Sequence, residues 1–161
     1  MMIVKSKPWK SYVFWIILSE LVGVLSGLLS KDGMEQYLRS VAQPSFAPPA
    51  AVFPIVWAIL YALMGIGMAR IWLYGVVPEK YNAQNLFLVQ LILNFFWPLI
   101  FFNAMAFGFA FAWIILLWIL VLAMLLAFWK QDRLAGLLQL PYLLWITFAA
   151  FLTFTVWMQN G

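Results

Sequence analysis

Aromatic side chains recur at helical spacing in three separate stretches of this chain. The stretches contain three sets of residues with steps of three or four positions: Phe53, Trp57 and Tyr61; Asn94, Trp97 and Phe101; and Trp145, Ala149 and Leu152. Residues three or four positions apart share one face of a helix, so each set predicts a stripe. Three stripes at one depth could line a pocket with large flat walls for an apolar ligand. The alternative is that these aromatics only pack the core of a helix bundle.

Conventional catalytic and metal-binding residues are scarce. The chain has no Cys and no His, which removes thiolate nucleophiles and iron–sulfur clusters together with the commonest general base and metal ligand. The polar residues inside its apolar stretches are few: Glu20, Gln90, Asn94, Gln139 and Thr147. They form no acid–base pair, no activated nucleophile and no metal site. The sequence therefore predicts no catalytic residue of an ordinary kind, no bound metal and no cofactor.

The composition places the chain in a membrane. It has 161 residues, of which 67% are apolar, 19% aromatic and 9% charged, whereas a soluble domain is about half apolar and about a quarter charged. A soluble fold of this size buries only about 70% of its unfolded surface, which leaves too little interior for so many apolar side chains. The sequence therefore predicts an integral membrane protein in contact with the lipid bilayer. Soluble enzymes, nucleic-acid-binding proteins and disordered chains are excluded.

Five apolar stretches are long enough to cross a bilayer as helices, which takes roughly 20 residues each. We expect them at residues 11–29, 50–74, 84–102, 106–129 and 134–157. Only helices and closed barrels pair all their backbone groups in lipid, and the alternation typical of barrel strands is absent. The predicted fold is all-α: a bundle of five transmembrane helices that forms a single membrane domain over residues 1–161.

Basic residues are distributed unevenly between the two ends of the predicted bundle. Five spans place seven of them on the side of the N-terminus: Lys5, Lys7, Lys10, Arg70, Lys80, Lys130 and Arg133. The other side has Lys31 and Arg39. Because cytoplasmic segments are enriched in Lys and Arg, we expect a cytoplasmic N-terminus, and the net charge of +4 needs no nucleic-acid partner. A signal peptide is the alternative for the first apolar run, but Glu20 within it argues against cleavage.

One predicted connection, residues 30–49, is much longer than the others. It contains Pro44, Pro48 and Pro49, which prevent a continuous helix and stiffen the chain. Residues 31–40 could form a short surface helix before these prolines. Loops of this length are usually functional or disordered, and this one carries Tyr37 and Phe46. We expect a lid over the outer end of the bundle, with a simple connector as the alternative.

Tryptophan is frequent, with ten residues. Four lie close to predicted helix ends, where indole rings suit the level of the lipid headgroups: Trp9, Trp72, Trp129 and Trp157. Three more can face lipid or neighbouring helices: Trp15, Trp113 and Trp118. Trp57, Trp97 and Trp145 lie inside their spans, one in each aromatic stripe. We expect these three to contact a ligand.

Two features of the first span leave alternatives open. An ionisable residue inside a membrane is costly and often functional, so we expect Glu20 either to be protonated and hydrogen-bonded to a neighbour or to face a wet cavity. Gly23 and Gly27 form a Gly-x-x-x-Gly pattern, which lets another helix approach closely. The approaching helix could belong to the same chain or to a second copy.

Several motifs of the chain resemble those of one membrane protein family. They are QPSFAPP at residues 43–49, VFPIVWAILYALMG at 52–65, LNFFWPLIFF at 93–102 and PYLLWITFA at 141–149. In this order, and on a five-helix plan, they are similar to the motifs of the TspO/MBR family. Its members are called tryptophan-rich sensory proteins, translocator proteins or peripheral-type benzodiazepine receptors.

This resemblance implies a five-helix bundle, often a homodimer, that binds porphyrins such as protoporphyrin IX, and also sterols and benzodiazepine-type ligands. Carried over to this chain, the family's pocket contains the three aromatic stripes together with Pro48, and Tyr37 matches a tyrosine of the family's loop. Phe46 stands where many members have Trp, and Thr153 where many have Asn. No Lys or Arg follows Arg133, so the C-terminal cholesterol-recognition pattern of animal members is missing. This absence favours a bacterial-type member in a bacterial inner membrane.

Three functions are consistent with these observations. The first is a membrane receptor or carrier for flat hydrophobic ligands, with a sensory, regulatory or transport role in tetrapyrrole handling. The second, which the resemblance implies, is a light-dependent enzyme that degrades porphyrins with the help of the pocket tryptophans. The third is a regulatory scaffold that senses a ligand and acts on another membrane protein through the loop. We favour the first, because ordinary catalytic residues are absent.

Overall fold

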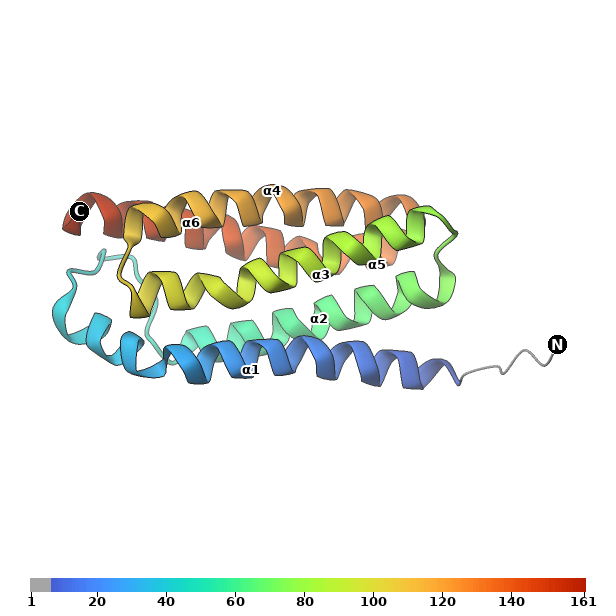
Figure 1. Ribbon diagram of the computed structural model, residues 1–161, viewed down its shortest axis with the longest axis horizontal. Coiled ribbons are helices and arrows are strands. Elements are labelled where there is room, and N and C mark those ends of the chain that lie inside the picture. Colours follow the sequence, from blue (N-terminus) through green and yellow to red (C-terminus); the bar gives the residue numbers. More distant parts are fainter. Residues whose placement is uncertain (1–6) are drawn as a thin grey trace.

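The computed structural model describes residues 7–161, and their regular structure is helical throughout (Figure 1). The elements follow one another in this order: α1 (Pro8–Ser40), α2 (Val52–Tyr74), α3 (Glu79–Pro98), the π-helical turn η1 (Leu99–Asn103), α4 (Phe107–Gln131), α5 (Arg133–Leu137) and α6 (Leu140–Asn160). The predicted all-α fold is confirmed within this range. Lys5, one of the basic residues assigned to the N-terminal side, lies outside the described residues.

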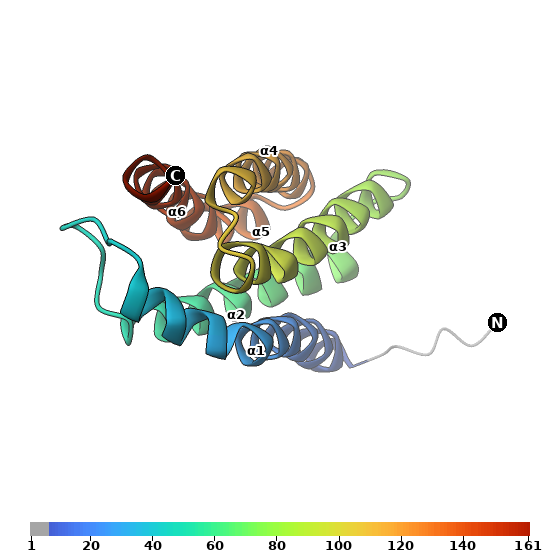
Figure 2. The ribbon, with the colours of Figure 1, turned by 60° about the vertical axis from the view of Figure 1, so that its left-hand side comes forward.

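The helices are arranged as a bundle that suits lipid on its outside. Five helical units have the length and hydropathy to cross a bilayer, with α3 and η1 forming one unit and α5 and α6 another. Large apolar side chains point outward, among them Leu28, Ile55 and Leu144, and the core is apolar as well. Helices that are apolar on all sides are typical of membrane spans. In both views α3 lies between the pair α1 and α2 and the pair α4 and α6 (Figures 1 and 2).

The first helix is longer than predicted. Residues 31–40 are helical, as the sequence allowed, but the predicted loop 30–49 is wrong in its first part, because these residues continue α1 without a break to Ser40 and the connection covers residues 41–51. At 1.5 Å per residue, a helix of 33 residues is about 50 Å long, whereas the hydrocarbon layer is about 30 Å thick. Its polar last turns therefore extend beyond the apolar layer as helix. Glu35, Gln36 and Arg39 favour this because they are good helix formers.

The third and fifth spans contain interruptions that we did not predict from the sequence. Pro98 has no N–H to continue the α-helical hydrogen-bond ladder, and the chain changes to the π-turn η1. There the N–H of Ala104 donates to the carbonyl of Leu99, five residues earlier, at 3.0 Å. The last span divides into α5 and α6 at Leu138 and Gln139. A π-turn changes which side the following residues face, and such turns are common at functional sites.

α1 and α2 approach each other closely at Gly65. A Cβ atom at this position would lie 2.5 Å from the Cα of Ile16 and 2.8 Å from the backbone carbonyl carbon of Trp15. Both neighbours are backbone atoms, so rotation of a side chain could not relieve the overlap. The missing side chain at Gly65 therefore allows α1 to pack directly on α2, as small residues commonly do between membrane helices.

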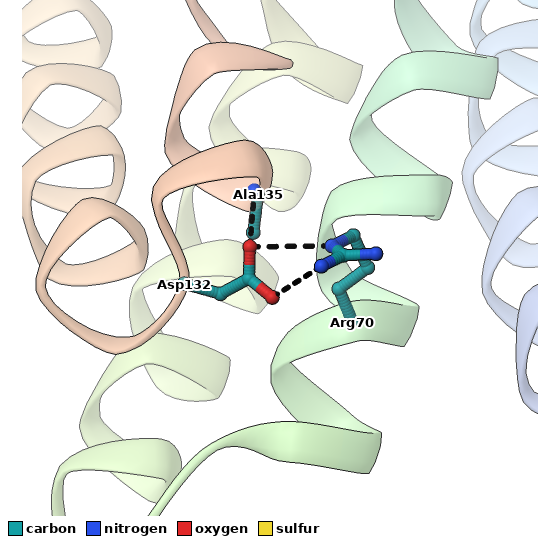
Figure 3. A network of polar contacts seen from close by, with 3 residues as sticks. All are labelled: Arg70, Asp132 and Ala135. Carbon is teal, nitrogen blue, oxygen red and sulfur yellow. Dashed lines mark hydrogen bonds and ion pairs between the residues drawn. The ribbon is translucent and has the colours of Figure 1, made fainter.

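An ion pair joins α2 to the connection between α4 and α5, at the end of the bundle away from the 41–51 loop (Figure 3). Nε and Nη2 of Arg70 donate to the two carboxylate oxygens of Asp132 at 3.2 and 2.7 Å. The N–H of Ala135 donates to Oδ1 of Asp132 at 3.0 Å, so this carboxylate also caps the N-terminus of α5. Burial raises the pKa of Asp132, but the hydrogen bonds from Arg70 and Ala135 outweigh burial and hold the pKa below its usual value.

We expect replacement of Asp132 by asparagine to lower thermal stability near neutral pH and to flatten its acid dependence. A carboxylate with a depressed pKa stabilises the fold at pH values above its unfolded pKa of about 3.9, and this contribution is lost as the pH falls through the folded pKa. Hydrogen bonds to a charged group contribute about 1–3 kcal/mol. The measurement is the melting temperature of wild type and Asp132→Asn in detergent, at about pH 7 and about pH 3. An equal loss on acidification in both proteins would contradict the assignment.

Candidate ligand-binding site

A cavity of about 460 Å³ lies inside the bundle, in the half nearer the 41–51 loop. α1, α2, the α3–η1 unit and α6 form its walls, and the 41–51 loop contributes to its roof. Ligand pockets in proteins commonly have volumes of about 300–1,000 Å³, with mostly apolar walls and a few polar groups. The cavity is therefore of a suitable size and character for a small apolar ligand.

Aromatic rings from α2 and α6 form one side of the cavity. The rings of Trp57 and Tyr61, one turn apart on α2, are 5.5 Å apart and inclined at 32°. Phe53 meets Trp145 of α6 edge to face, with ring centroids 5.8 Å apart. Ala149 follows Trp145 by one turn and is small, which leaves space beside the indole. This side therefore presents flat surfaces from two helices.

The opposite side is formed by α3, η1 and the last turns of α1. Trp97 and Phe101 are stacked with their ring centroids 4.9 Å apart and their planes inclined at 21°. Tyr37 of α1 packs on the same Phe101 at 5.2 Å. Phe101 belongs to η1, so the π-turn after Pro98 holds this ring in the wall. The contact explains how Tyr37, distant in sequence, joins the aromatic cluster.

A chain of hydrogen bonds lies behind the inner part of the cavity. Nδ2 of Asn94 donates to the hydroxyl of Tyr142 at 2.8 Å, and this hydroxyl donates to Oε1 of Gln90 at 2.7 Å. All three residues are buried. Because Nδ2 is engaged, the amide of Asn94 is held in one orientation, and its Oδ1 is the atom that can accept a hydrogen bond from a ligand.

Two buried indole N–H groups of the cavity wall have no hydrogen-bond partner within residues 7–161. They belong to Trp97 and Trp145, and both nitrogen atoms are buried. By contrast, the indole of Trp113 donates to the carbonyl of Leu93, and that of Trp118 to the hydroxyl of Thr147, each at 2.8 Å. A buried donor without a partner costs about 1–3 kcal/mol.

The 41–51 loop is fixed to the far end of α6. Asn160 makes two hydrogen bonds to the backbone of Ala42: its Nδ2 donates to the carbonyl at 2.9 Å, and its Oδ1 accepts from the N–H at 3.1 Å. The ring of Phe46 stacks on that of Phe151 at 5.2 Å. Figure 2 shows the loop on the side of the bundle where α1 and α6 end. Pro48 of this loop lines the cavity, and the role of the loop as a lid stays a prediction.

All the residues that the sequence analysis assigned to the site line this one cavity: Tyr37, Pro48, Phe53, Trp57, Tyr61, Asn94, Trp97, Phe101, Trp145, Ala149 and Leu152. The structure therefore brings together three helical stripes and two residues from the segment before α2. The structure shows where these residues lie, and their contact with a ligand stays a prediction.

The contribution of α1 was largely missed. Its lining residues include a set with alternating steps of three and four positions: Glu20, Gly23, Gly27, Ser30, Met34 and Tyr37. The spacing was a usable signal, but the mixed residue types hide it from a search for apolar or aromatic periodicity. Gly23 packs within the same chain, because a Cβ there would overlap the ring of Tyr61, whereas Gly27 is exposed and a Cβ there would meet no atom within 4 Å.

Glu20 also lines the cavity. Of the two environments expected for it, a position facing a cavity is the one that agrees with this. No hydrogen bond or ion pair joins its carboxyl to another of the residues 7–161. Among the same residues, no group of three His, Cys, Asp or Glu side chains lies close enough together to hold a metal ion. The residues around the cavity can therefore provide flat apolar contact and a few hydrogen bonds, and they include no conventional catalytic set.

The fold and the cavity define the class of protein: an integral membrane protein with five helical spans, within residues 7–161, around an interior, mostly apolar pocket with aromatic walls. Residues 15–158 match the model of the TspO/MBR family. The chain is 34% identical over 140 residues to the tryptophan-rich protein TspO of Chlorobaculum tepidum, which covers 86% of this chain and 89% of that protein. It therefore belongs to the TspO/MBR family, and the resemblance noted in the sequence is confirmed.

Other relatives come from different organisms. The translocator protein of Sus scrofa is 35% identical over 157 residues, covering 95% of this chain and 92% of that protein. Protein CrtK of Rhodobacter capsulatus is 37% identical over 124 residues, covering 75% of this chain and 76% of that protein. Bacterial and animal proteins thus share almost the whole membrane domain with this chain.

Proposed function

We propose that this protein is a membrane receptor or carrier that binds flat hydrophobic molecules in the cavity, with porphyrins such as protoporphyrin IX as its main ligands. The observation that carries the proposal is the convergence of all three aromatic stripes on one cavity of about 460 Å³. Flat aromatic walls favour flat ligands, because stacked and edge-to-face ring contacts add to the burial of apolar area.

The polar groups of the cavity support a ligand with a few hydrogen-bonding groups on an apolar body. The Oδ1 of Asn94 can accept a hydrogen bond from a ligand donor, and the indole N–H groups of Trp97 and Trp145 have no partner within residues 7–161. The chain has no His and no Cys to bind iron, so a metal-free porphyrin suits the residues better than a haem held through its metal.

The proposed role in the cell is supported by the names of the relatives. Relatives are named translocator protein and tryptophan-rich protein, and these names support transport or sensing in tetrapyrrole handling. Sterols and benzodiazepine-type molecules are proposed as additional ligands. A bacterial inner membrane, a cytoplasmic N-terminus and a homodimer stay predictions. The basic residues Arg70, Lys80, Lys130 and Arg133 support the orientation, because they lie near helix ends at one end of the bundle.

Tryptophan fluorescence in detergent provides the test. Protoporphyrin IX should quench the emission of the wild-type protein saturably. The double variant Trp57→Phe, Trp145→Phe should bind at least about fivefold more weakly, since two ring contacts of about 0.5–1.5 kcal/mol each contribute about 1–3 kcal/mol beyond their area. The matched control is Trp9→Phe, Trp129→Phe, which removes two exposed indoles away from the cavity. Quenching that does not saturate, or equal affinity of both double variants, would contradict the proposed function.

A further inference from the structure

A second hollow lies on the outside of the bundle, as a groove between α2 and α6. The groove has a volume of about 430 Å³, and its walls are large apolar side chains from the two helices: Val56, Ile59, Leu60, Leu144, Trp145 and Phe148. Pro141, in the first turn of α6, also lines it. Ile59 and Leu144 are 56% and 62% exposed, so the groove is open to the surroundings of the protein.

The surroundings of the groove are the interior of the bilayer. Its residues belong to two of the helical units that are long and apolar enough to span a membrane, Val52–Tyr74 and Arg133–Asn160. The hydrocarbon tails of lipids therefore surround this part of the protein. An unfilled apolar groove leaves its wall atoms without dispersion partners on one side. Occupation of the groove by a hydrocarbon chain is therefore favoured.

A helix, of a second copy or of another protein, is a less suitable occupant. Contacts between membrane helices are rich in small residues, which allow close approach, and in polar residues, which hydrogen-bond across the contact. Among the described residues that line the groove, none is glycine, alanine, serine or threonine, and none is charged. A flexible chain of methylene groups can follow such a surface of large side chains, whereas a helix would be held away from it.

Trp145 separates this groove from the interior cavity, because it lines both. Phe53 meets its ring at a centroid distance of 5.8 Å, and Phe148 at 5.5 Å. Phe148 lines the groove and also contacts Phe46 of the 41–51 loop, at 6.4 Å. A chain in the groove therefore packs on the outer side of the wall that Trp145 forms.

We infer that the groove is a second binding site of this protein, which holds one acyl chain of a membrane lipid in a fixed place against Trp145. The site differs from the rest of the lipid-facing surface, because a chain between two helices gains contacts on several sides. The inference goes beyond the proposed function, since it concerns a different surface and a different class of ligand.

Photolabelling in a bilayer tests the inference. The whole protein is placed in nanodiscs of phosphatidylcholine that contain a small fraction of a phosphatidylcholine with an alkyl diazirine in one acyl chain. After illumination, peptide mass spectrometry measures the label on each residue. Ile55 is the matched control for Ile59: it is the same residue type on the same helix, it is 64% exposed, and it does not line the groove. Because the two differ in depth by one helical turn, about 6 Å, the diazirine is placed at two depths in separate samples.

We expect Ile59 to carry at least about threefold more label than Ile55, because the packing contacts of the groove retain the chain. Trp145 should be labelled as well. Val56→Phe adds a ring in the groove and should reduce the label on Ile59 to the level of Ile55. Val52→Phe is its control, since Val52 is half-buried like Val56, lies one turn earlier and does not line the groove. This control should keep the wild-type pattern.

Three results would overturn the inference. Label that follows exposure, with Ile55 at least equal to Ile59 at both depths, would show that chains pass over the groove as over any other lipid-facing surface. Label missing from Ile59 but present on Ile55 would show that protein covers the groove, a second copy included. An unchanged pattern in a Val56→Phe protein that melts at the wild-type temperature would place the retained chain elsewhere. The samples contain no porphyrin, so none of these results bears on the proposed function.

Discussion

Replacing Gly27 by phenylalanine is expected to weaken porphyrin binding strongly without lowering thermal stability. Gly27 lines the cavity, and a Cβ atom built on it meets no other atom within 4 Å. A ring at this position can therefore occupy the space between the aromatic walls without displacing the backbone. Glycine in a helix is also less favourable than most residues by up to about 1 kcal/mol, so the substitution does not weaken α1.

The measurement is a fluorescence titration with protoporphyrin IX combined with a melting curve in the same detergent. We expect a loss of affinity of at least about tenfold, because the ring removes volume from the cavity and blocks stacking on Trp57 and Trp97. Leu25→Phe is the matched control: it adds an aromatic ring to the same helix at an exposed residue that does not line the cavity. A stable Gly27→Phe protein with wild-type affinity would place the binding site elsewhere.

Replacing Gly65 by alanine is expected to have the largest effect on stability. The added methyl group would overlap backbone atoms of Trp15 and Ile16, so α1 and α2 must separate along their contact. Overpacking of a core usually costs about 1–3 kcal/mol, and an overlap with backbone lies at the upper end of this range or beyond. For a chain of this length, about 3 kcal/mol corresponds to a decrease in melting temperature of roughly 6–12 °C.

The control is the same substitution at an open position. Gly27→Ala adds an identical methyl group to α1 where no atom is within 4 Å, and it should melt at or slightly above the wild-type temperature because alanine favours the helix. If Gly65→Ala and Gly27→Ala melt together, α1 and α2 are not packed as the structure shows.

The number of helices and the three aromatic stripes could be predicted because each depends on a local rule. The length of apolar stretches follows from the thickness of the bilayer, and the faces of Phe53, Trp57 and Tyr61 follow from the helical repeat. Each stripe lies in a helical segment or directly beside one, so its residues stay on one face in the folded protein. That the three stripes line one cavity depends on tertiary packing, which helical spacing alone does not predict. The resemblance to the family supplied this part of the prediction.

The features that sequence analysis missed depend on competition between local and tertiary effects. Residues 31–40 are polar and were therefore assigned to the connection after the first span. They include good helix formers, and α1 continues through them to Ser40. Prediction of the π-turn after Pro98 would require knowing how the backbone replaces the hydrogen bond that proline cannot donate. The hydrogen-bond pair between Asn160 and Ala42 joins residues far apart in sequence, and no local pattern predicts it.

The packing in the structure changes the interpretation of individual tryptophans. Trp15 was assigned either to lipid or to neighbouring helices, and it is buried against Phe87 at a ring distance of 5.6 Å. Trp113 and Trp118 connect helices through their indole N–H groups. The indole nitrogens of Trp97 and Trp145 are buried and have no hydrogen-bond partner within residues 7–161. Trp113 and Trp118 thus join helices through their N–H groups, whereas Trp97 and Trp145 line the cavity.

The central claim is that the cavity between α1, α2, the α3–η1 unit and α6 is the binding site for a flat ligand. The most direct test is an experimental structure of the protein with protoporphyrin IX. We predict density for the macrocycle between Trp57, Trp97 and Trp145, beneath the 41–51 loop. Density for the porphyrin only on the lipid-facing surface, with the cavity closed or filled by protein side chains, would contradict the claim.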